Sequence, residues 1–346
     1  MKRNAILCAV FLLSLRIVAW SQDMNEVGVG ANDRAQARQA TNVFRKAQPA
    51  NTARGMASRE QEGRLTLRSS TTAKASVASS NRGGVRYPGD LTFQGGTVVD
   101  SAESHPIYLL PNGNCPISQC WGNPEGFLRD LADSRFIHLV DQYIGLRASE
   151  RYTLGDRAKI NYTPPTVPLT DTDVQTFVHA VASAAGQNGY GHIFHLFLPP
   201  GQDECFDSTF TVCYSPDNVN TFFFCAYHSS ADFPDIGHVL YSVEPFQDVP
   251  GCRVRPGTPN GQLVDSTNDV LSHELIETIT DPDGTGWWNS TGSGMFGQEI
   301  GDECVFLLPS ATSMFFDSDP FIYKIDDHSY ATQPEYSNAL HGCAVH

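Results

Sequence analysis

The sequence predicts an α/β domain with a single mixed sheet flanked by helices and stabilised by disulfides. Short apolar runs alternate with stretches of helical periodicity, as they do when strands and helices follow one another in an α/β fold. Eight cysteines lie beyond an N-terminal segment that has the features of an export signal. The acidic region 87–346 is long enough to bury a large core, so we expect it to form the folded domain.

Four apolar runs are predicted to be buried strands, because they are short, rich in branched and aromatic residues, and bounded by Pro or Gly. They are residues 107–110, 193–198, 221–227 and 237–243. Two segments between them predict helices. Residues 124–139 carry apolar side chains at roughly helical spacing, and residues 170–185 do so after an Asp/Thr cap.

The N-terminus predicts a secretory signal peptide over residues 1–21. Lys2 and Arg3 give it a charged start, and the apolar stretch 5–19 ends next to small residues that suit a cleavage site. This stretch is interrupted by Arg16 and is too short to remain as a membrane span. We therefore expect a secreted, extracellular protein without stable membrane insertion.

Charge divides the chain into two unequal parts. Residues 1–86 hold 14 basic and 5 acidic residues, whereas residues 87–346 hold 9 basic and 33 acidic ones. Residues 22–86 are poor in aromatic residues, so we expect a disordered basic leader or propeptide. The acidic domain lacks the basic surface that nucleic acid requires, and it suits cations, or uncharged and basic substrates.

The cysteines predict disulfides. Eight remain once the signal peptide is removed, and an even number in an exported chain favours pairing over a zinc cluster, for which no C-x-x-C spacing exists. Eight cysteines allow 105 pairings, so the connectivity stays open. Local pairs such as Cys115–Cys120 and Cys205–Cys213 are plausible, and Cys304 with Cys343 would tie down the C-terminus.

The segment 268–282 predicts a buried helix that carries chemistry. A residue among 266–268 is expected to cap it, and Asp281 before Pro282 is expected to end it. Its buried face would consist of Val270, Leu271, Leu275, Ile276 and Ile279.

On this helix His273 and Glu277 are four residues apart, so their side chains point to one place, with Glu274 beside it. This is the spacing of the zincin helix H-E-x-x-H with Glu as the second ligand, and zinc accepts both donor types. Glu274 would act as the general base.

A third ligand is expected downstream, where Glu299 and Asp302 follow a segment rich in Gly, Ser and Trp. Either could bind the metal, or one could orient His273 instead. An oxygen-rich site could also hold calcium, and His273 is the reason to prefer zinc. Residues 87–346 are thus predicted to be an acidic α/β metal-binding domain.

Three segments resemble the EXORDIUM / phosphate-induced protein 1 family: SHELIETITDP at 272–282 with a Trp after it, EIGDEC at 299–304, and YSN at 336–338 before Cys343. The residues that match the family motifs are His273, Glu274, Glu277, Glu299, Asp302 and Cys304. The resemblance implies a secreted or cell-wall protein, described in plants as promoting growth, with no settled enzymatic activity. The Cys115/Cys120 region and the basic leader depart from the plant pattern, which indicates a divergent member and is compatible with a microbial source.

Other candidate residues have plainer interpretations. His192 and His195 would lie on opposite faces of a regular strand, and a core or edge role is expected for them. His228 could supply a metal ligand from another strand. Trp287 and Trp288 could stack on a sugar, although packing of their loop over the core is the simpler interpretation.

Three functions remain open from the sequence. The first is a secreted zinc-dependent metallohydrolase, peptidase-like, that acts on a peptide or cell-wall substrate. The second is a non-catalytic extracellular, EXORDIUM-like protein with a structural metal site. The third is a carbohydrate-binding wall protein that uses Trp287 and Trp288. The sequence does not indicate the oligomeric state.

Overall fold

The fold is that of a computed structural model. The predicted signal peptide and nearly all of the predicted leader lie outside the described residues. The structure describes residues 27–28, 90–215, 224–248, 252–289, 299–304, 321–325 and 327–345.

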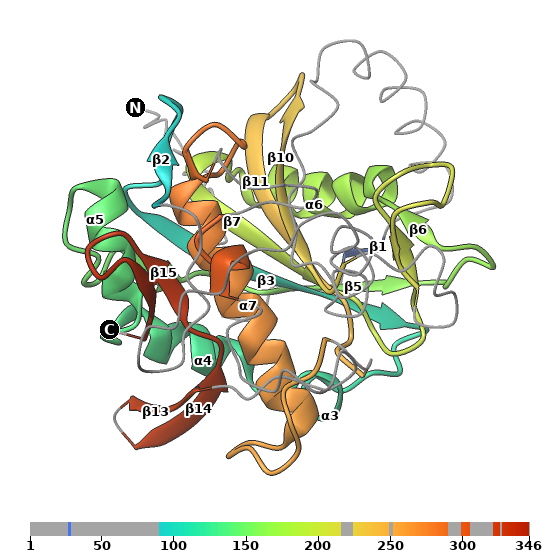
Figure 1. The fold of residues 1–346 in the computed structure, drawn as a ribbon. Coiled ribbons are helices and arrows are strands. Elements are labelled where there is room, and N and C mark those ends of the chain that lie inside the picture. Colours follow the sequence, from blue (N-terminus) through green and yellow to red (C-terminus); the bar gives the residue numbers. More distant parts are fainter. Residues whose placement is uncertain are drawn as a thin grey trace, which may run out of the picture.

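A seven-stranded mixed sheet forms the centre of the molecule, with strands in the order β1-β5-β3-β7-β11-β10 and β4 also paired to β3 (Figure 1). All pairings are parallel except β10–β11, so the predicted mixed sheet is confirmed. The strands are β1 (Val27–Gly28), β3 (Ala102–Pro111), β4 (Tyr152–Leu154), β5 (Ala158–Tyr162), β7 (Gly189–Phe197), β10 (Tyr227–Phe233) and β11 (Gly237–Glu244).

The predicted strands 107–110, 193–198 and 237–243 correspond to β3, β7 and β11. The prediction for 221–227 is wrong in position, because β10 begins only at Tyr227. Residues 221–223 lie outside the described residues. Cys225 and Ala226 are buried but precede the strand, and Cys225 is held by a disulfide to Cys252. The apolar run therefore leads into the strand.

One face of the sheet is covered by α6 (Asp171–Ala185), which contacts β7 and β11. The prediction of this helix is confirmed. Thr170 caps it through a capping box, in which its hydroxyl accepts from the backbone N–H of Asp173 and the Asp173 carboxylate accepts from the N–H of Thr170. Gly186 ends it in the left-handed conformation that glycine adopts readily.

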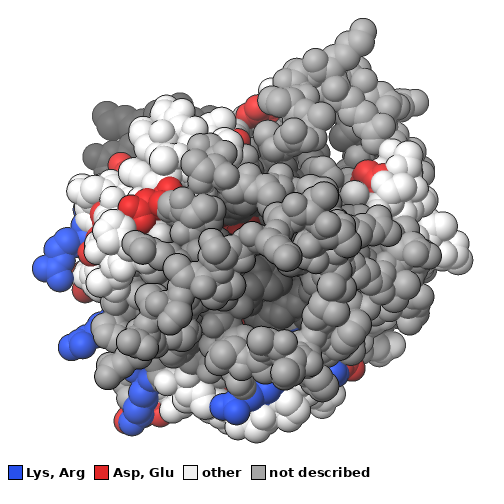
Figure 2. Space-filling view, viewed as in Figure 1, with Lys and Arg blue, Asp and Glu red and all other residues white. Residues whose placement is uncertain are grey.

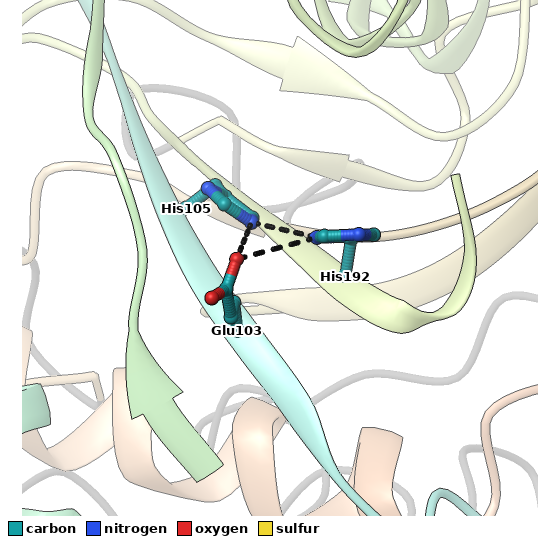
Figure 3. Close-up of side chains that lie close together, drawn as sticks. All are labelled: Glu103, His105 and His192. Carbon is teal, nitrogen blue, oxygen red and sulfur yellow. Dashed lines mark hydrogen bonds and ion pairs between the residues drawn. The ribbon is translucent and has the colours of Figure 1, made fainter. Parts of the chain in front are cut away.

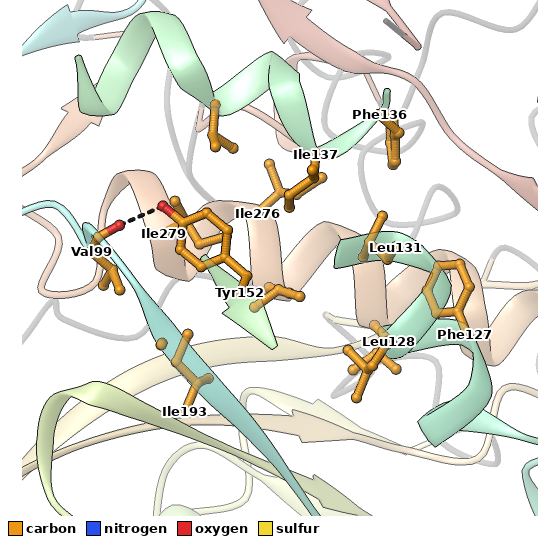
Figure 4. Close-up of a cluster of buried hydrophobic side chains, with 14 of the residues drawn as sticks. Val99, Phe127, Leu128, Leu131, Phe136, Ile137, Tyr152, Ile193, Ile276 and Ile279 are labelled. Carbon is orange, nitrogen blue, oxygen red and sulfur yellow. Dashed lines mark hydrogen bonds between the residues drawn. The ribbon is translucent and has the colours of Figure 1, made fainter. Parts of the chain in front are cut away.

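The other face is covered by α4 (Pro124–Ala132), the 3-10 helix η1 (Ile137–Val140), α5 (Asp141–Ile144) and α7 (Gln262–Thr280). Apolar side chains of these helices and the sheet residue Ile193 belong to one buried hydrophobic cluster (Figure 4). The single helix predicted over 124–139 is wrong. Ser134 interrupts it, because its hydroxyl donates to the carbonyl of Leu131 and accepts from the N–H of Ile137.

Helix α7 begins at Gln262, earlier than predicted, with Gly261 as its N-cap. Ser266 and Thr267 were expected to cap the helix, but they lie inside it. Their hydroxyls donate to carbonyls one turn earlier, so they satisfy their hydrogen bonds within the helix. The helix ends at Thr280, just before the predicted stop at Asp281.

In the described part of the chain, four small sheets lie around the main sheet. The prediction of a single mixed sheet therefore holds for the central sheet only. They pair β2 (Thr92–Phe93) with β12 (Trp287–Trp288), β13 (Phe321–Ile325) with β14 (His328–Thr332), β15 (Glu335–Ser337) with β16 (Gly342–Ala344), and β6 (Leu169–Thr170) with β8 (Glu204–Cys205) and β9 (Cys213–Tyr214). Two short helices, α3 (Ile117–Cys120) and η2 (Asp302–Cys304), complete the described elements.

Four disulfides stabilise the domain. Cys115–Cys120, Cys205–Cys213 and Cys304–Cys343 confirm the pairs considered from the sequence, and Cys225–Cys252 is the fourth. Disulfides persist in oxidising compartments, so they are compatible with an extracellular protein. Within the described part of the chain, no helix is both long and apolar enough to cross a membrane.

A half-buried carboxylate links α6 to the sheet. Asp171 Oδ1 accepts hydrogen bonds from the hydroxyls of Tyr227, at 2.9 Å, and Tyr241, at 2.7 Å. The Tyr227 hydroxyl also lies 3.1 Å from Glu204 Oε1. Burial raises the pKa of Asp171 from 3.8 to about 6, although the two tyrosines and Gln175 oppose the shift. Between about pH 4 and pH 6 the folded chain therefore holds a proton on Asp171 that the unfolded chain has released.

Replacement of Asp171 by Asn should make stability less dependent on pH. Asn keeps an oxygen for both tyrosines but cannot ionise. The pKa is raised on folding, so the wild type loses stability as pH rises through the window from about 4 to about 7. Across this window the free energy of unfolding of the wild type, measured by urea titration, should fall by about 3 kcal/mol relative to that of Asp171→Asn. Parallel curves for the two proteins would contradict this prediction.

Candidate metal centre on helix α7

Helix α7 is buried along nearly its whole length. Every residue from Asp265 to Thr280 is buried, because the helix packs on β10 and β11 on one side and on β14 and α4 on the other. Its polar side chains therefore face protein. A helix that is buried on all sides normally carries apolar residues all round, so these polar side chains need partners within the fold.

The interior of the protein holds many acids. Among the described residues, ten carboxylates are buried and no Lys or Arg is. On the face shown in Figure 2, the Lys and Arg side chains lie along the left and lower edges of the molecule. The buried acids are Glu204, Glu244, Asp265, Asp269, Glu274, Glu277, Asp281, Glu299, Glu303 and Glu335. The buried ionisable groups that can carry positive charge are therefore histidines.

The predicted pairing of His273 with Glu277 is present. His273 Nε2 lies 3.1 Å from Glu277 Oε1 and 3.8 Å from Asp302 Oδ1. The backbone N–H of Asp302 donates to the same Oε1 of Glu277, at 3.1 Å. The short segment 299–304 thus crosses directly over the polar face of α7.

A second histidine approaches from the sheet. His228 lies on β10, and its Nδ1 is 3.3 Å from Glu274 Oε2 and 3.5 Å from Glu277 Oε2. Its Nε2–H donates to the carbonyl oxygen of Asp281, at 3.2 Å, which turns Nδ1 toward the two glutamates. Glu299 Oε1 lies 3.7 Å from Nε2 of the same ring.

Glu277 is the shared member of two candidate ligand groups. In one, donor atoms of His273, Glu274 and Glu277 lie within 4.8 Å of one another, and in the other those of His228, Glu277 and Glu299 do. Glu277 follows His273 by four residues and Glu274 by three, so one helical turn brings it beside both. We call His228, His273, Glu274, Glu277, Glu299 and Asp302 the α7 centre.

The segment over α7 is held in place by several contacts. The N–H of Tyr336 donates to the carbonyl of Ile300, and Gln333 Nε2 donates to that of Gly301. Cys304 is joined to Cys343. A Cβ on Gly301 would lie 2.5 Å from His273 Nδ1 and 2.9 Å from Glu277 Oε1, so only glycine permits this approach.

Charges inside the α7 centre shift the pKa values of its groups in opposite directions. Burial lowers the pKa of His228, but its contacts with Glu274 and Glu277 outweigh this and raise it to about 10. Burial is likewise outweighed by Glu277 at His273, whose pKa is raised well above its usual value. Burial raises the pKa of Glu277, yet His273 and His228 lower it overall. At Glu274 burial prevails and raises the pKa.

Of the residues predicted for the site, the structure brings His273, Glu274 and Glu277 into one ligand-spaced group and places Asp302 Oδ1 3.8 Å from His273, whereas Glu299 groups with His228 and Glu277 instead. The sequence left His228 as a weak candidate, because a residue 46 positions before Glu274 gives no local signal of proximity. Glu335 was missed entirely. It is buried on β15, and its carboxylate forms no hydrogen bond with the described residues. Its pKa is raised well above normal by burial, which His273 only partly opposes.

Two further candidates, His195 and Trp287, have structural roles. His195 is buried on the opposite face of β7 from His192, as expected, and its Nδ1 lies 2.8 Å from the Ser242 hydroxyl. Trp287 Nε1 donates to the carbonyl of Tyr143, and its ring contacts the rings of Tyr143 and Phe93. This packing supports the interpretation of Trp287 as part of a loop held against the core.

Comparison of the chain with protein-family models, with curated proteins and with solved structures finds no match. The resemblance to the EXORDIUM / phosphate-induced protein 1 family therefore remains an expectation from the motif residues.

Replacement of Gly301 by Ala should destabilise the protein, because the new methyl group would overlap the His273 ring and Glu277 Oε1 beneath it. We expect a loss of about 1–3 kcal/mol in the free energy of unfolding, the usual effect of overpacking a filled site. Gly342→Ala is the matched control, since nothing lies within 4 Å of a Cβ there. Urea titration of both variants tests this, and equal stabilities would show that the segment does not press on His273.

Proposed function

We propose that the α7 centre binds a zinc ion and that the protein is a secreted zinc-dependent hydrolase of peptide-like bonds. The observation that carries this proposal is the convergence of His273, Glu274 and Glu277, whose donor atoms lie within 4.8 Å of one another in the buried interior. The carboxylate of Asp302 lies 3.8 Å from His273, and that of Glu299 lies near Glu277 and His228.

The residues of the α7 centre fit a metal ion. Neither ring nitrogen of the buried His273 forms a hydrogen bond with a described residue. Imidazole and carboxylate together suit zinc, whereas calcium takes oxygen ligands, so two histidines favour zinc. His273 and Glu277 would hold the ion, with Asp302 or Glu299 as the third ligand. Ligand atoms around zinc stand about 3.3 Å apart, and the distances of 3.1 and 3.8 Å from His273 Nε2 bracket this value.

In this proposal the surrounding residues have distinct chemical roles. Zinc in such a site polarises a carbonyl group and activates water. Glu274, whose pKa is raised by burial, accepts the proton of the attacking water and passes it to the leaving nitrogen. His228 holds the Glu274 carboxylate in place, while its Nε2–H is fixed by the carbonyl of Asp281. The N–H of Asp302 fixes Glu277.

Burial favours a second candidate function. The side chains of His273, Glu274, Glu277 and Glu299 are fully buried, and structural zinc sites are closed whereas catalytic ones keep an open position. In this alternative the same residues hold a structural ion in a non-catalytic extracellular protein. The two functions differ in what Glu274 does, so they can be separated by experiment.

Metal analysis tests the proposed site first. Purified protein should contain close to one zinc per chain at the α7 centre, and Glu277→Gln should lower zinc affinity at least tenfold, because it alters the shared ligand. Glu303→Gln is the matched control, since Glu303 lies in the same segment but pairs with Asn289. Loss of zinc from both variants alike, or calcium in place of zinc, would contradict the proposal.

Glu274→Gln separates catalysis from structure. The variant should keep its zinc, because Glu274 is assigned as the base, and its kcat/KM on a peptide library should fall about 10²–10⁴-fold. If Glu274→Gln cleaves as fast as wild type, or if zinc-loaded wild type cleaves nothing, the catalytic proposal is contradicted and the structural role is the function that remains. His228→Gln should keep zinc and lower kcat. Loss of zinc would instead identify His228 as a ligand.

A further inference from the structure

A second cluster of ligand-type side chains lies on the opposite face of the sheet from α7. Glu103 and His105 belong to β3, and His192 belongs to the neighbouring strand β7. Glu103 and His192 are register partners, and His105 lies two residues further along β3, so all three point to one face (Figure 3). Phe194 and Ile107, which share this face, pack in the core cluster of α6, so the cluster is separate from the α7 centre.

The three donor atoms have the spacing of metal ligands. His105 Nε2 lies 3.0 Å from His192 Nδ1, and Glu103 Oε2 lies 3.7 Å from each of them. A triangle with these sides has a circumscribed radius of about 2.0 Å, so a point in its plane lies about 2.0 Å from all three atoms. That is the length of a zinc–nitrogen or zinc–oxygen bond.

His105 is fixed in the orientation that a ligand requires. Its Nδ1 lies 3.1 Å from the carbonyl oxygen of Asp156, which can only accept a hydrogen bond, so Nδ1 carries the proton and the neutral ring directs the Nε2 lone pair at the cluster. The ring stacks on Phe194. A Cβ on Gly155 would lie 2.3 Å from its Cε1, so the backbone closes tightly over the ring.

We propose that Glu103, His105 and His192 form a second metal site, which takes a divalent transition-metal ion of the zinc type. Two imidazoles and one carboxylate are the donors that zinc prefers among such ions and that calcium and magnesium do not. The site is open on one side, because the Glu103 side chain is 50% exposed and that of His192 is 25% exposed, whereas His105 is buried. Solvent or an exogenous ligand completes the coordination.

Equilibrium dialysis against Zn²⁺, followed by metal analysis, tests this site. Wild type should bind one more zinc per chain than His192→Ala, and Glu103→Gln should weaken that extra binding at least tenfold. Both altered side chains are partly exposed, so their loss should leave the fold intact. Circular dichroism checks the fold of both variants. The zinc that they still bind should also respond to Glu277→Gln as it does in the wild type.

The matched control is His179→Ala. His179 is partly exposed on α6 and pairs with the single carboxylate of Asp235, without a second histidine. The His179→Ala variant should bind as much zinc as wild type. The proposal is overturned if His192→Ala binds zinc with the stoichiometry and affinity of wild type, or if His179→Ala loses as much, which would mark the extra zinc as general surface binding. Neither outcome depends on hydrolytic activity, so failure here is distinct from failure of the α7 centre.

Discussion

The structure depends on how the negative charge buried in its interior is neutralised. Ten described carboxylates are buried without a buried Lys or Arg, and an uncompensated charge in the interior is very costly. Three kinds of compensation are available: protonated histidines, protonated carboxyls, and a bound cation. His228 and His273 supply the first, and the raised pKa values of Glu274 and Glu335 supply the second. A divalent ion held by neutral imidazoles would carry the same charge as the two imidazolium groups, so the centre suits either state.

The topology places these charges where only a few elements can meet them. β10 is the antiparallel edge strand of the sheet, and His228 points from it toward α7. The segment 299–304 closes over the other side of the helix, and the Cys304–Cys343 disulfide ties it to the C-terminal hairpin of β15 and β16. Glu277 lies between the two and contacts a different histidine with each carboxylate oxygen. A strand, a helix and a loop distant in sequence thus converge on one side chain.

The local parts of this arrangement were predictable, and the distant parts were not. The spacing of His273, Glu274 and Glu277 is a property of any helix, and the segment 299–304 follows closely enough for a fold-back to be inferred. The proximity of His228 depends on strand pairing, which a single sequence does not reveal. The start of α7 was misplaced because its first turns carry polar residues typical of a cap. Those residues are buried by tertiary contacts, which override the local preference.

Strand β7 shows how one short segment can serve two chemically different places. His192 and His195 lie on opposite faces of the strand, so His192 joins Glu103 and His105 in a partly exposed cluster between β3 and β7, while His195 is buried beside Ser242 under α7. The difference in exposure has a kinetic consequence. In the proposed second site, an ion between β3 and β7 would exchange with solvent directly, because the side chains of Glu103 and His192 reach the surface. An ion in the proposed α7 site would leave only when the segment 299–304 or the helix itself moved, so its release would be coupled to the opening of the fold.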